Sequence, residues 1–447
     1  MKGGKAAWVI LLVFLLVVPL APAGVEFVEI EERRHIDDPV PLDNDMGKRW
    51  DIDGVTIIYI NGSFYEMGYQ QGILLNTEIT RNLRAFHRFY ENWQGIDHSD
   101  LVDLWEKQRA YVCPELIDFI QGTADALCIP FTDIACIWVA EGKSYSSHCC
   151  SMAAWGSATK TGDLIHLRSM EFPLNITDPV SGAYIQDTPV LVVADPAEGY
   201  GFLYPTFAGY VVEDGMNENG VVVANMWSSN HDHTQYGAPM GTRLFEALFS
   251  ASNAQQAVDI ITSNRTFGYN FVVSDGKAPP VGYAVETTAN HTYVGTWDGP
   301  AEALSPFWSI RDVVRRSNIF LDPATAAVQR DPYNPRHPRH ILGMLKGEPW
   351  YYVWHHYKAL SNGIEQHFGQ LDINNTFDML RNVYHGGYDP VWRLMVSGYP
   401  KETWWQWVTC PASGEIHISF AEGERSAYLN DIHGLNLLKT LENKYPS

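Results

Sequence analysis

The chain has 447 residues, of which 46% are hydrophobic and 13% aromatic, a composition that excludes a disordered or low-complexity protein. Its formal net charge of -21 at pH 7 argues against nucleic acid and anionic membrane surfaces as partners, because both would repel it. We interpret the excess of acidic residues as the solvated surface of an extracellular protein.

Residues 1–23 have the parts of an export signal. Lys2 and Lys5 give a basic start, residues 6–20 form an uncharged apolar run, and an Ala-Pro-Ala end offers small residues to a signal peptidase. We expect cleavage after Ala23 and a secreted or otherwise extracytoplasmic protein. An uncleaved membrane anchor is the alternative, because the run is nearly long enough to span a bilayer. No later segment is apolar enough, so we expect no stable membrane insertion after signal removal.

The segment from residue 24 to residue 149 is predicted to be mainly helical. A short β-rich run over residues 55–60 comes first and ends in an Asn-Gly turn. Ser63 can cap the helix that follows, with Glu66 three residues later as its capping-box partner. A second helical stretch is predicted over residues 101–127, with an interruption at a proline.

Near residue 144 the pattern changes to short β-type runs separated by turns such as Gly162-Asp163. Such an alternation of strands, helices and further strands fits a layered α+β body better than a doubly wound sheet. We predict strands over residues 164–167, 190–194, 211–212, 221–224, 404–409 and 415–420, and helices over residues 254–261 and 339–345.

Six cysteines are too few to frame a chain of this length with disulfides. Export would permit one disulfide among Cys113, Cys128 and Cys136, but their spacing does not require it. Neither a Cys-x-x-Cys pair nor a His-x-x-x-His cluster occurs, so we predict no metal ion and no organic cofactor.

The most informative segment runs from residue 144 to residue 172. It places Cys150 at the head of a predicted strand and Arg168 on the second strand of the same hairpin. Because a hairpin brings the end of its second strand beside the start of its first, we expect Arg168 and Glu171 to approach Cys150. A cationic neighbour lowers the pKa of a thiol and raises its thiolate fraction.

This segment resembles the nucleophile region of N-terminal-nucleophile (Ntn) hydrolases of the acyl-coenzyme A:6-aminopenicillanate acyltransferase family (isopenicillin-N acyltransferase, peptidase C45-like). Choloylglycine hydrolase and acid ceramidase are more distant relatives. The family pattern is Cys-Ser/Thr, a small-residue strand, a Gly turn and Arg-Asn-x-Asp. Here it reads Cys150-Ser151, MAAWGSATKTG and Arg168-Ser169-Met170-Glu171. Further motifs, over about residues 55–425, are Tyr65 to Gly72, Gly215 to Gly220 with Asn225 after it, Ser317-Asn318-Ile319, and Arg336-His337-Pro338-Arg339.

The chain departs from the family pattern at three positions. Ser169 stands where the family has Asn, Glu171 where it has Asp, and Ile319 where it has His. Because Glu is one methylene longer than Asp, the place of the acidic group in the site is left open.

The resemblance implies a four-layer αββα sandwich of antiparallel sheets and a chain that cuts itself between Cys149 and Cys150. Residues 24–149 would be a prosegment or light chain, and residues 150–447 the catalytic chain. The first residue of that chain has a free α-amine with a pKa of about 7.7–8.0, which can accept the thiol proton without a histidine.

The roles carried over by the resemblance follow the matched positions. Cys150 is the nucleophile, Arg168 orients the substrate or tunes the thiol, and Glu171 holds the α-amine. Asn225 and Asn318 supply amide donors to the oxyanion and to the α-amine. Arg339 anchors Glu171 or the wall of the site.

Other interpretations stay open. Cys149 is the local alternative to Cys150 as nucleophile. A papain-like cysteine protease would pair Cys150 with a distant histidine, although the usual Cys-Gly-Ser-Cys-Trp surroundings are absent. An exported binding protein on an inactive Ntn fold is a third class. The partner would be a small-molecule or peptide amide substrate. The sequence leaves open which amide it is, whether the acyl group passes to water or to another acceptor, and the oligomeric state.

Overall fold

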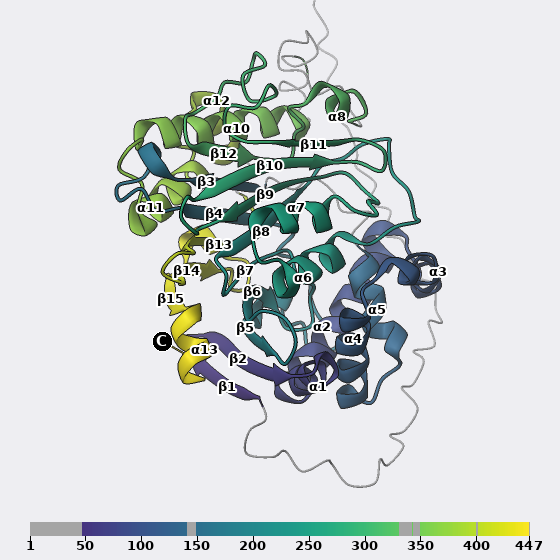
Figure 1. Ribbon diagram of the computed structural model, residues 1–447. Helices are drawn as coiled ribbons and strands as arrows, with labels where there is room; N and C mark the ends of the chain where they lie inside the picture. The colour runs from purple at the N-terminus through teal and green to yellow at the C-terminus, as the bar shows by residue number, and fades with distance from the viewer. Residues whose placement is uncertain (1–46, 141–148, 330–341, 343–348, 399–400, 447) are drawn as a thin grey trace, which may run out of the picture. The chain divides into compact units, whose positions relative to one another are not determined.

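The computed structural model describes residues 47–140, 149–329, 342, 349–398 and 401–446 (Figure 1). Two β-sheets form the centre of this part of the chain. Sheet A contains, in spatial order, β1 (Lys48–Ile52), β2 (Val55–Gly62), β5 (Pro189–Pro196), β6 (Phe202–Phe207), β7 (Asp214–Asn217), β8 (Val221–Trp227), β9 (Tyr269–Asp275), β10 (Val281–Thr287) and β11 (Thr292–Gly295). Sheet B contains β12 (Val313–Arg316), β3 (Cys150–Ala154), β4 (Ile165–Glu171), β13 (Thr403–Cys410), β14 (Glu415–Phe420) and β15 (His433–Asn436).

The sheets pack face to face, with β3 and β12 against β8, β9 and β10. Helices α6 (Met240–Ser250) and α7 (Ala254–Ile261) contact the strands of sheet A. Helix α11 (Ile373–Tyr384) contacts β4 and β13 of sheet B and packs on α10 (Pro349–Gln366), which contacts α12 (Pro390–Gly398). This order, helices, sheet, sheet, helices, confirms the predicted αββα fold class (Figure 1). Two further short helices are α8 (Pro323–Ala327) and α13 (Leu437–Asn443).

The chain before Cys150 supplies strands as well as helices. Its strand β2 pairs in parallel with β5, whereas the other ladders between the described strands are antiparallel. The helices are α1 (Phe64–Leu74), α2 (Asn76–Phe89), α3 (His98–Gln108), α4 (Pro114–Leu127) and α5 (Phe131–Val139). The predicted capping box is confirmed at α1: the Ser63 backbone nitrogen donates to Glu66 Oε2 at 2.7 Å, and the Glu66 nitrogen donates to Ser63 Oγ at 3.3 Å.

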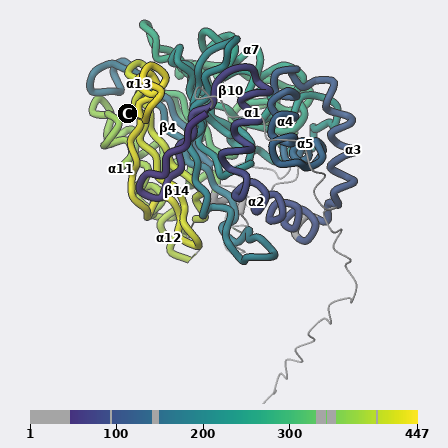
Figure 2. The backbone as a smooth tube through the Cα atoms, turned by 90° about the horizontal axis from the view of Figure 1, so that it is seen from below, coloured from purple at the N-terminus to yellow at the C-terminus, as the bar shows by residue number. Residues whose placement is uncertain are grey.

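Glycines in the Tyr65–Gly72 motif allow α1 and α4 to cross at close range, and Figure 2 shows these two helices side by side. A Cβ atom on Gly68 would lie 1.9 Å from the carbonyl oxygen of Phe119. The same atom on Gly122 would lie 2.0 Å from the carbonyl oxygen of Tyr65. Both distances are far inside van der Waals contact, so the crossing requires glycine on each helix.

One predicted strand is wrong. Val211 and Val212 are buried but are not in a strand; the strand of this region is β7, which begins at Asp214. The chain turns just before them, because the Tyr210 nitrogen donates to the Phe207 carbonyl at 2.8 Å. The other strands predicted in this half, and the helix over residues 254–261, are confirmed within a few residues at their ends.

Several expectations fall outside the described residues. The export signal is one, and the predicted helix over residues 339–345, apart from residue 342, is another. Within the described part of the chain, no helix combines the length and apolar character that crossing a bilayer requires.

Candidate active site

The hairpin of β3 and β4 positions the predicted nucleophile. Cys150 pairs with Ser169, and Ser151 pairs with Arg168. Because residues directly opposite in a ladder share a face, Cys150, Ser169 and Glu171 lie on one side of sheet B. That side faces α11, since Cys150 belongs to the same apolar cluster as Leu380 of that helix.

The thiol of Cys150 is fully buried and lies 3.7 Å from the hydroxyl oxygen of Tyr384, the last residue of α11. Burial raises the pKa of this thiol to about 12, although the Tyr384 hydroxyl and the positive charge of Arg168 act to lower it. The thiol is therefore protonated at neutral pH in the intact chain, and a base must remove its proton before it can act as a nucleophile.

Glu171 lies on the Cys150 side of β4, two residues beyond Ser169. Ser169 Oγ donates to Glu171 Oε1 at 3.4 Å and accepts from Gln406 Nε2 at 3.1 Å. Burial raises the pKa of Glu171, while a hydrogen bond from Thr403 and the charge of Lys401 favour its ionised form. Burial in turn lowers the pKa of Lys401.

Arg339, the predicted anchor of Glu171, lies outside the described residues. Within the described part of the chain, Lys401 is a cation close enough to Glu171 to stabilise its negative charge. Lys401 lies just before β13, the strand that carries Thr403, so β13 brings both groups to the end of β4.

Arg168 is fully buried and leaves β4 on the face opposite to Glu171, toward sheet A. Its Nε lies 3.4 Å from Asp214 Oδ2, and its side chain is hydrogen-bonded to Cys149. Asp214 also accepts from Trp405 Nε1 at 3.1 Å. Burial raises the pKa of Asp214 to about 7, and the guanidinium opposes that shift. Arg168 is thus next to both cysteines, but it contacts the thiol of Cys149 and points away from that of Cys150.

Asn225 lies on β8 and holds a third buried acid. Its Nδ2 donates to the Glu213 carbonyl at 2.6 Å and to Glu213 Oε2 at 2.7 Å. Its neighbour Ala224 pairs with Asp214, whose side chain meets sheet B, so Asn225 lies on the other face of sheet A. Burial raises the pKa of Glu213, and the Asn225 hydrogen bond acts against this rise. The Asn225 amide is therefore committed to Glu213 in the intact chain.

Asn318 lies in the turn after β12, at the edge of sheet B where β3 begins. Arg316 pairs with Ser151, so continuation of the ladder brings the next residues of this turn beside Cys150. Asn318 Nδ2 donates to the Trp227 carbonyl at 2.7 Å, which connects the turn to the end of β8. The structure thus brings Asn318 to the edge of sheet B at which Cys150 lies, and the side-chain amide of Asn318 is hydrogen-bonded to the backbone.

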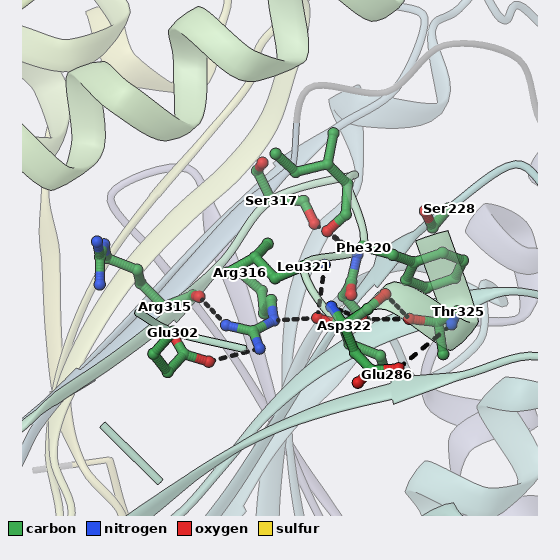
Figure 3. Close-up of polar contacts among 12 residues, drawn as sticks. Ser228, Glu286, Glu302, Arg315, Arg316, Ser317, Phe320, Leu321, Asp322 and Thr325 are labelled. Atoms are coloured by element: carbon green, nitrogen blue, oxygen red, sulfur yellow. Dashed lines mark hydrogen bonds and ion pairs between the residues drawn. The ribbon is translucent and has the colours of Figure 1, made fainter. Parts of the chain in front are cut away.

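A buried ionic network holds this turn in place (Figure 3). Arg316 Nε lies 2.9 Å from Glu286 Oε1, and its Nη2 lies 2.6 Å from Glu302 Oε1; all three side chains are fully buried. Glu286 also accepts hydrogen bonds from the backbone nitrogens of Leu321 and Asp322 and from Thr325 Oγ1, at 2.9, 3.1 and 2.5 Å. Glu286 is on β10 and Arg316 on β12, so the network also connects the two sheets.

Histidine and tryptophan side chains near the site pack in the interior of the protein. His166 lies 2.9 Å from Ser151 Oγ and 2.8 Å from Ser274 Oγ, and burial lowers its pKa to about 3. It is a neutral residue packed between the sheets. Trp404, Trp405 and Trp407 are fully buried and belong to the core.

Sequence reasoning missed Tyr384, Lys401, Thr403 and Gln406. Each comes from a segment that lies more than two hundred residues after Cys150 and carries no local motif. Their contribution depends on α11 and β13 packing against the hairpin. In the described residues, no group of three or more His, Cys, Asp and Glu side chains is arranged to hold a metal ion.

Neither a family model nor a curated protein matches the chain. Solved structures similar to it include penicillin V acylase from Agrobacterium tumefaciens, with 13% identity, a TM-score of 0.38, and coverage of 65% of this chain and 87% of that one. Two others are single-residue variants of conjugated bile acid hydrolase from Clostridium perfringens, with 14% and 13% identity. Both have a TM-score of 0.35 and cover 65% of this chain and 93% of theirs. With TM-scores below 0.5, functional assignment depends on the residues of this chain.

Proposed function

We propose that this protein is an exported, self-cleaving amide hydrolase of the Ntn type with Cys150 as its N-terminal nucleophile. The observation that carries the proposal is the position of Cys150. It is the first residue of a buried strand in the middle of an αββα sandwich, its thiol facing a hydroxyl and a carboxyl group. The substrate is a linear amide, either a peptide or an N-acyl amine, and the acyl group goes to water or to another amine.

The high pKa of the thiol fits a chain that becomes active only after cleavage. While the bond between Cys149 and Cys150 is intact, the Cys150 nitrogen is a neutral amide without basicity. Cleavage turns it into an α-amine with a pKa of about 7.7–8.0, placed on the same residue as the thiol. This amine then takes the thiol proton during attack on the substrate carbonyl and returns a proton to the leaving amine.

The surrounding polar residues support a division of roles. Glu171, on the Cys150 side of β4, stabilises the ammonium form of the new terminus. Arg168, held by Asp214, fixes the Cys149 side of the scissile bond and adds positive potential at Cys150. Asn318 is the proposed donor to the oxyanion, and such a donor contributes roughly 3–4 kcal/mol in the transition state. Asn225 instead holds Glu213 in place.

A papain-like mechanism is less well supported. It requires a histidine in hydrogen-bond reach of the thiol. In the described residues, His166 binds Ser151 and Ser274, and Tyr384 is the side chain next to the Cys150 thiol. His356 packs against the Tyr384 ring, with centroids 5.3 Å apart, and burial lowers its pKa to about 3.

The test is denaturing electrophoresis of the purified protein with N-terminal sequencing of the larger fragment. We expect two chains, the larger one beginning at Cys150. Cys150→Ala should stay a single inactive chain. Cys149→Ala is the matched control, because it removes a neighbouring thiol but keeps the scissile carbonyl, and it should still be cut. Active protein made of one uncut chain, or a new terminus at another residue, would exclude this mechanism and leave an inactive Ntn-like binding protein or a different enzyme.

A further inference from the structure

Self-cleavage has a requirement that the mature enzyme does not have. Before the first cut there is no α-amine at Cys150, so another group must take the thiol proton. Burial holds the pKa of that thiol near 12, which makes the need for a base acute. Substrate hydrolysis and self-cleavage can therefore depend on different residues of the same site.

A continuous line of hydroxyl groups leads from the thiol to a carboxylate. Cys150 Sγ lies 3.7 Å from Tyr384 Oη. Burial raises the pKa of Tyr384, and the Ser169 side chain beside its hydroxyl acts against that rise. Ser169 Oγ donates to Glu171 Oε1 at 3.4 Å. Gln406 Nε2 donates to Ser169 Oγ at 3.1 Å, which orients the serine proton toward Glu171.

We propose that Tyr384 and Ser169 form a relay that carries the thiol proton of Cys150 to the Glu171 carboxylate during self-cleavage. The proposal rests on the proposed function, and it assigns to Tyr384 and Ser169 a role in activation of the precursor. Tyr384 contacts the reacting sulfur, so it is a catalytic residue for this step. Ser169 transmits the proton, and Gln406 is a positioning residue.

The proton and electron pairs balance along this path. The thiol proton moves to Tyr384 Oη, the Tyr384 proton to Ser169 Oγ, and the Ser169 proton to Glu171. The thiolate then forms a C–S bond with the Cys149 carbonyl carbon. When the tetrahedral intermediate collapses, the C–N bond breaks and the departing nitrogen receives the proton back from Glu171. Water hydrolyses the resulting thioester, which frees the thiol and the Cys149 carboxyl group.

The relay also gives a chemical reason for two departures from the family pattern. Ser169 replaces an asparagine, and a hydroxyl accepts one proton and donates another at the same oxygen, whereas an asparagine amide accepts at its oxygen and donates from its nitrogen. Glu171 replaces an aspartate, and the extra methylene extends its carboxylate within the face it shares with Ser169. Burial raises the pKa of Glu171, and Thr403 and Lys401 act against that rise by favouring the ionised carboxylate that the relay needs at its end.

The test measures the rate of self-cleavage of the full chain. The chain is produced by cell-free translation, and the fragment beginning at Cys150 is followed with time. Tyr384→Phe removes only the hydroxyl and should slow cleavage by roughly 10²-fold or more, the usual contribution of positioned proton transfer. Tyr428→Phe is the matched control, because its ring packs against Tyr384 at 5.8 Å between centroids, and it should cleave within about twofold of the parent chain.

Two changes at Ser169 separate proton transfer from packing. Ser169→Ala should slow cleavage to a similar degree, whereas Ser169→Thr, which keeps the hydroxyl, should restore most of the parent rate. If Tyr384→Phe and Ser169→Ala chains, shown to be folded by circular dichroism, cut at the parent rate, the relay is excluded while the proposed function stands. If the parent chain itself is never cut at Cys150, the proposed function fails first.

Discussion

Cys150 and Tyr384 are separated by 234 positions in the chain, yet the sulfur of one lies 3.7 Å from the hydroxyl oxygen of the other. The first residue of β3 thus meets the last residue of α11. The outer helical layer, and not only the sandwich of sheets, forms the surroundings of the thiol.

The thiol of Cys150 should be protected from alkylation until the chain is cut. Its complete burial and its raised pKa both slow reaction with iodoacetamide at neutral pH. Mass spectrometry of partly cut protein distinguishes peptides that contain the intact Cys149–Cys150 bond from those that begin at Cys150. We expect labelling of Cys150 only in the second group, while exposed Cys128 is labelled equally in both. Equal labelling of Cys150 in cut and uncut chains would contradict this.

Arg168 should be important for stability as well as activity. Arg168→Met removes the cation next to Asp214 and leaves a buried acid without its partner, which costs about 3–5 kcal/mol. The folded pKa of Asp214, about 7, is above its ordinary 3.8, so its contribution to stability falls as pH rises from about 4 to 7. The decrease in unfolding free energy caused by Arg168→Met should therefore be larger at pH 8 than at pH 5.

Urea denaturation in a Cys150→Ala background, where the chain stays whole, measures the effect of Arg168→Met. Adding Asp214→Asn should recover part of the lost stability, because it removes the uncompensated charge. A midpoint that Arg168→Met leaves unchanged at both pH values would show that the ion pair contributes nothing.

The two carboxylates beside Arg316 should be unequal. Glu286→Gln disturbs an ion pair and acceptors for two backbone nitrogens and Thr325, so we expect a loss of about 3–5 kcal/mol. Glu302→Gln alters one ion pair and leaves Arg316 paired with Glu286, so its effect should be clearly smaller. Urea midpoints of the two variants decide the order, and a greater loss with Glu302→Gln would contradict the structure.

Self-cleavage should accelerate as pH rises. Glu171 must be ionised to receive the proton, and burial raises its pKa above the ordinary 4.5, so the active fraction grows with pH beyond the usual carboxyl range. Initial rates between pH 5 and 9 test this, and Glu171→Gln should remove the rise. The titratable and charged groups that act on Glu171 or respond to it are Lys401, Arg168, Cys150, Tyr384 and Tyr428. A rate independent of pH in the parent chain would argue against Glu171 as the acceptor.

Gly68→Ala should separate α1 from α4. The added methyl group would lie 1.9 Å from the Phe119 carbonyl oxygen, and overpacking of this kind costs typically 1–3 kcal/mol. Gly398→Ala is the control, because its added Cβ meets no atom within 4 Å. Thermal unfolding in the Cys150→Ala background should show a lower midpoint for Gly68→Ala alone. Equal midpoints would mean that the helices move apart without cost.

Local chemistry in the sequence was sufficient for the elements that depend on neighbouring residues. The capping box of Ser63 and Glu66 and the strand at β13 were predicted because each uses contacts or periodicity within a few positions. The hairpin also put Cys150 at the head of β3, since turn residues and strand pattern together set its register. The strand predicted at Val211 was wrong because apolar residues at a chain reversal resemble a buried strand.

Only the tertiary structure decided which groups surround the thiol. The register of β3 and β4 turns Arg168 toward Asp214 and Glu171 toward the helical layer, and a shift of one residue would exchange them. Tyr384 and Lys401 enter because α11 and β13 pack on this hairpin. Such contacts between distant segments leave no periodic pattern in the sequence, because they depend on how the helices and strands of the whole core pack together.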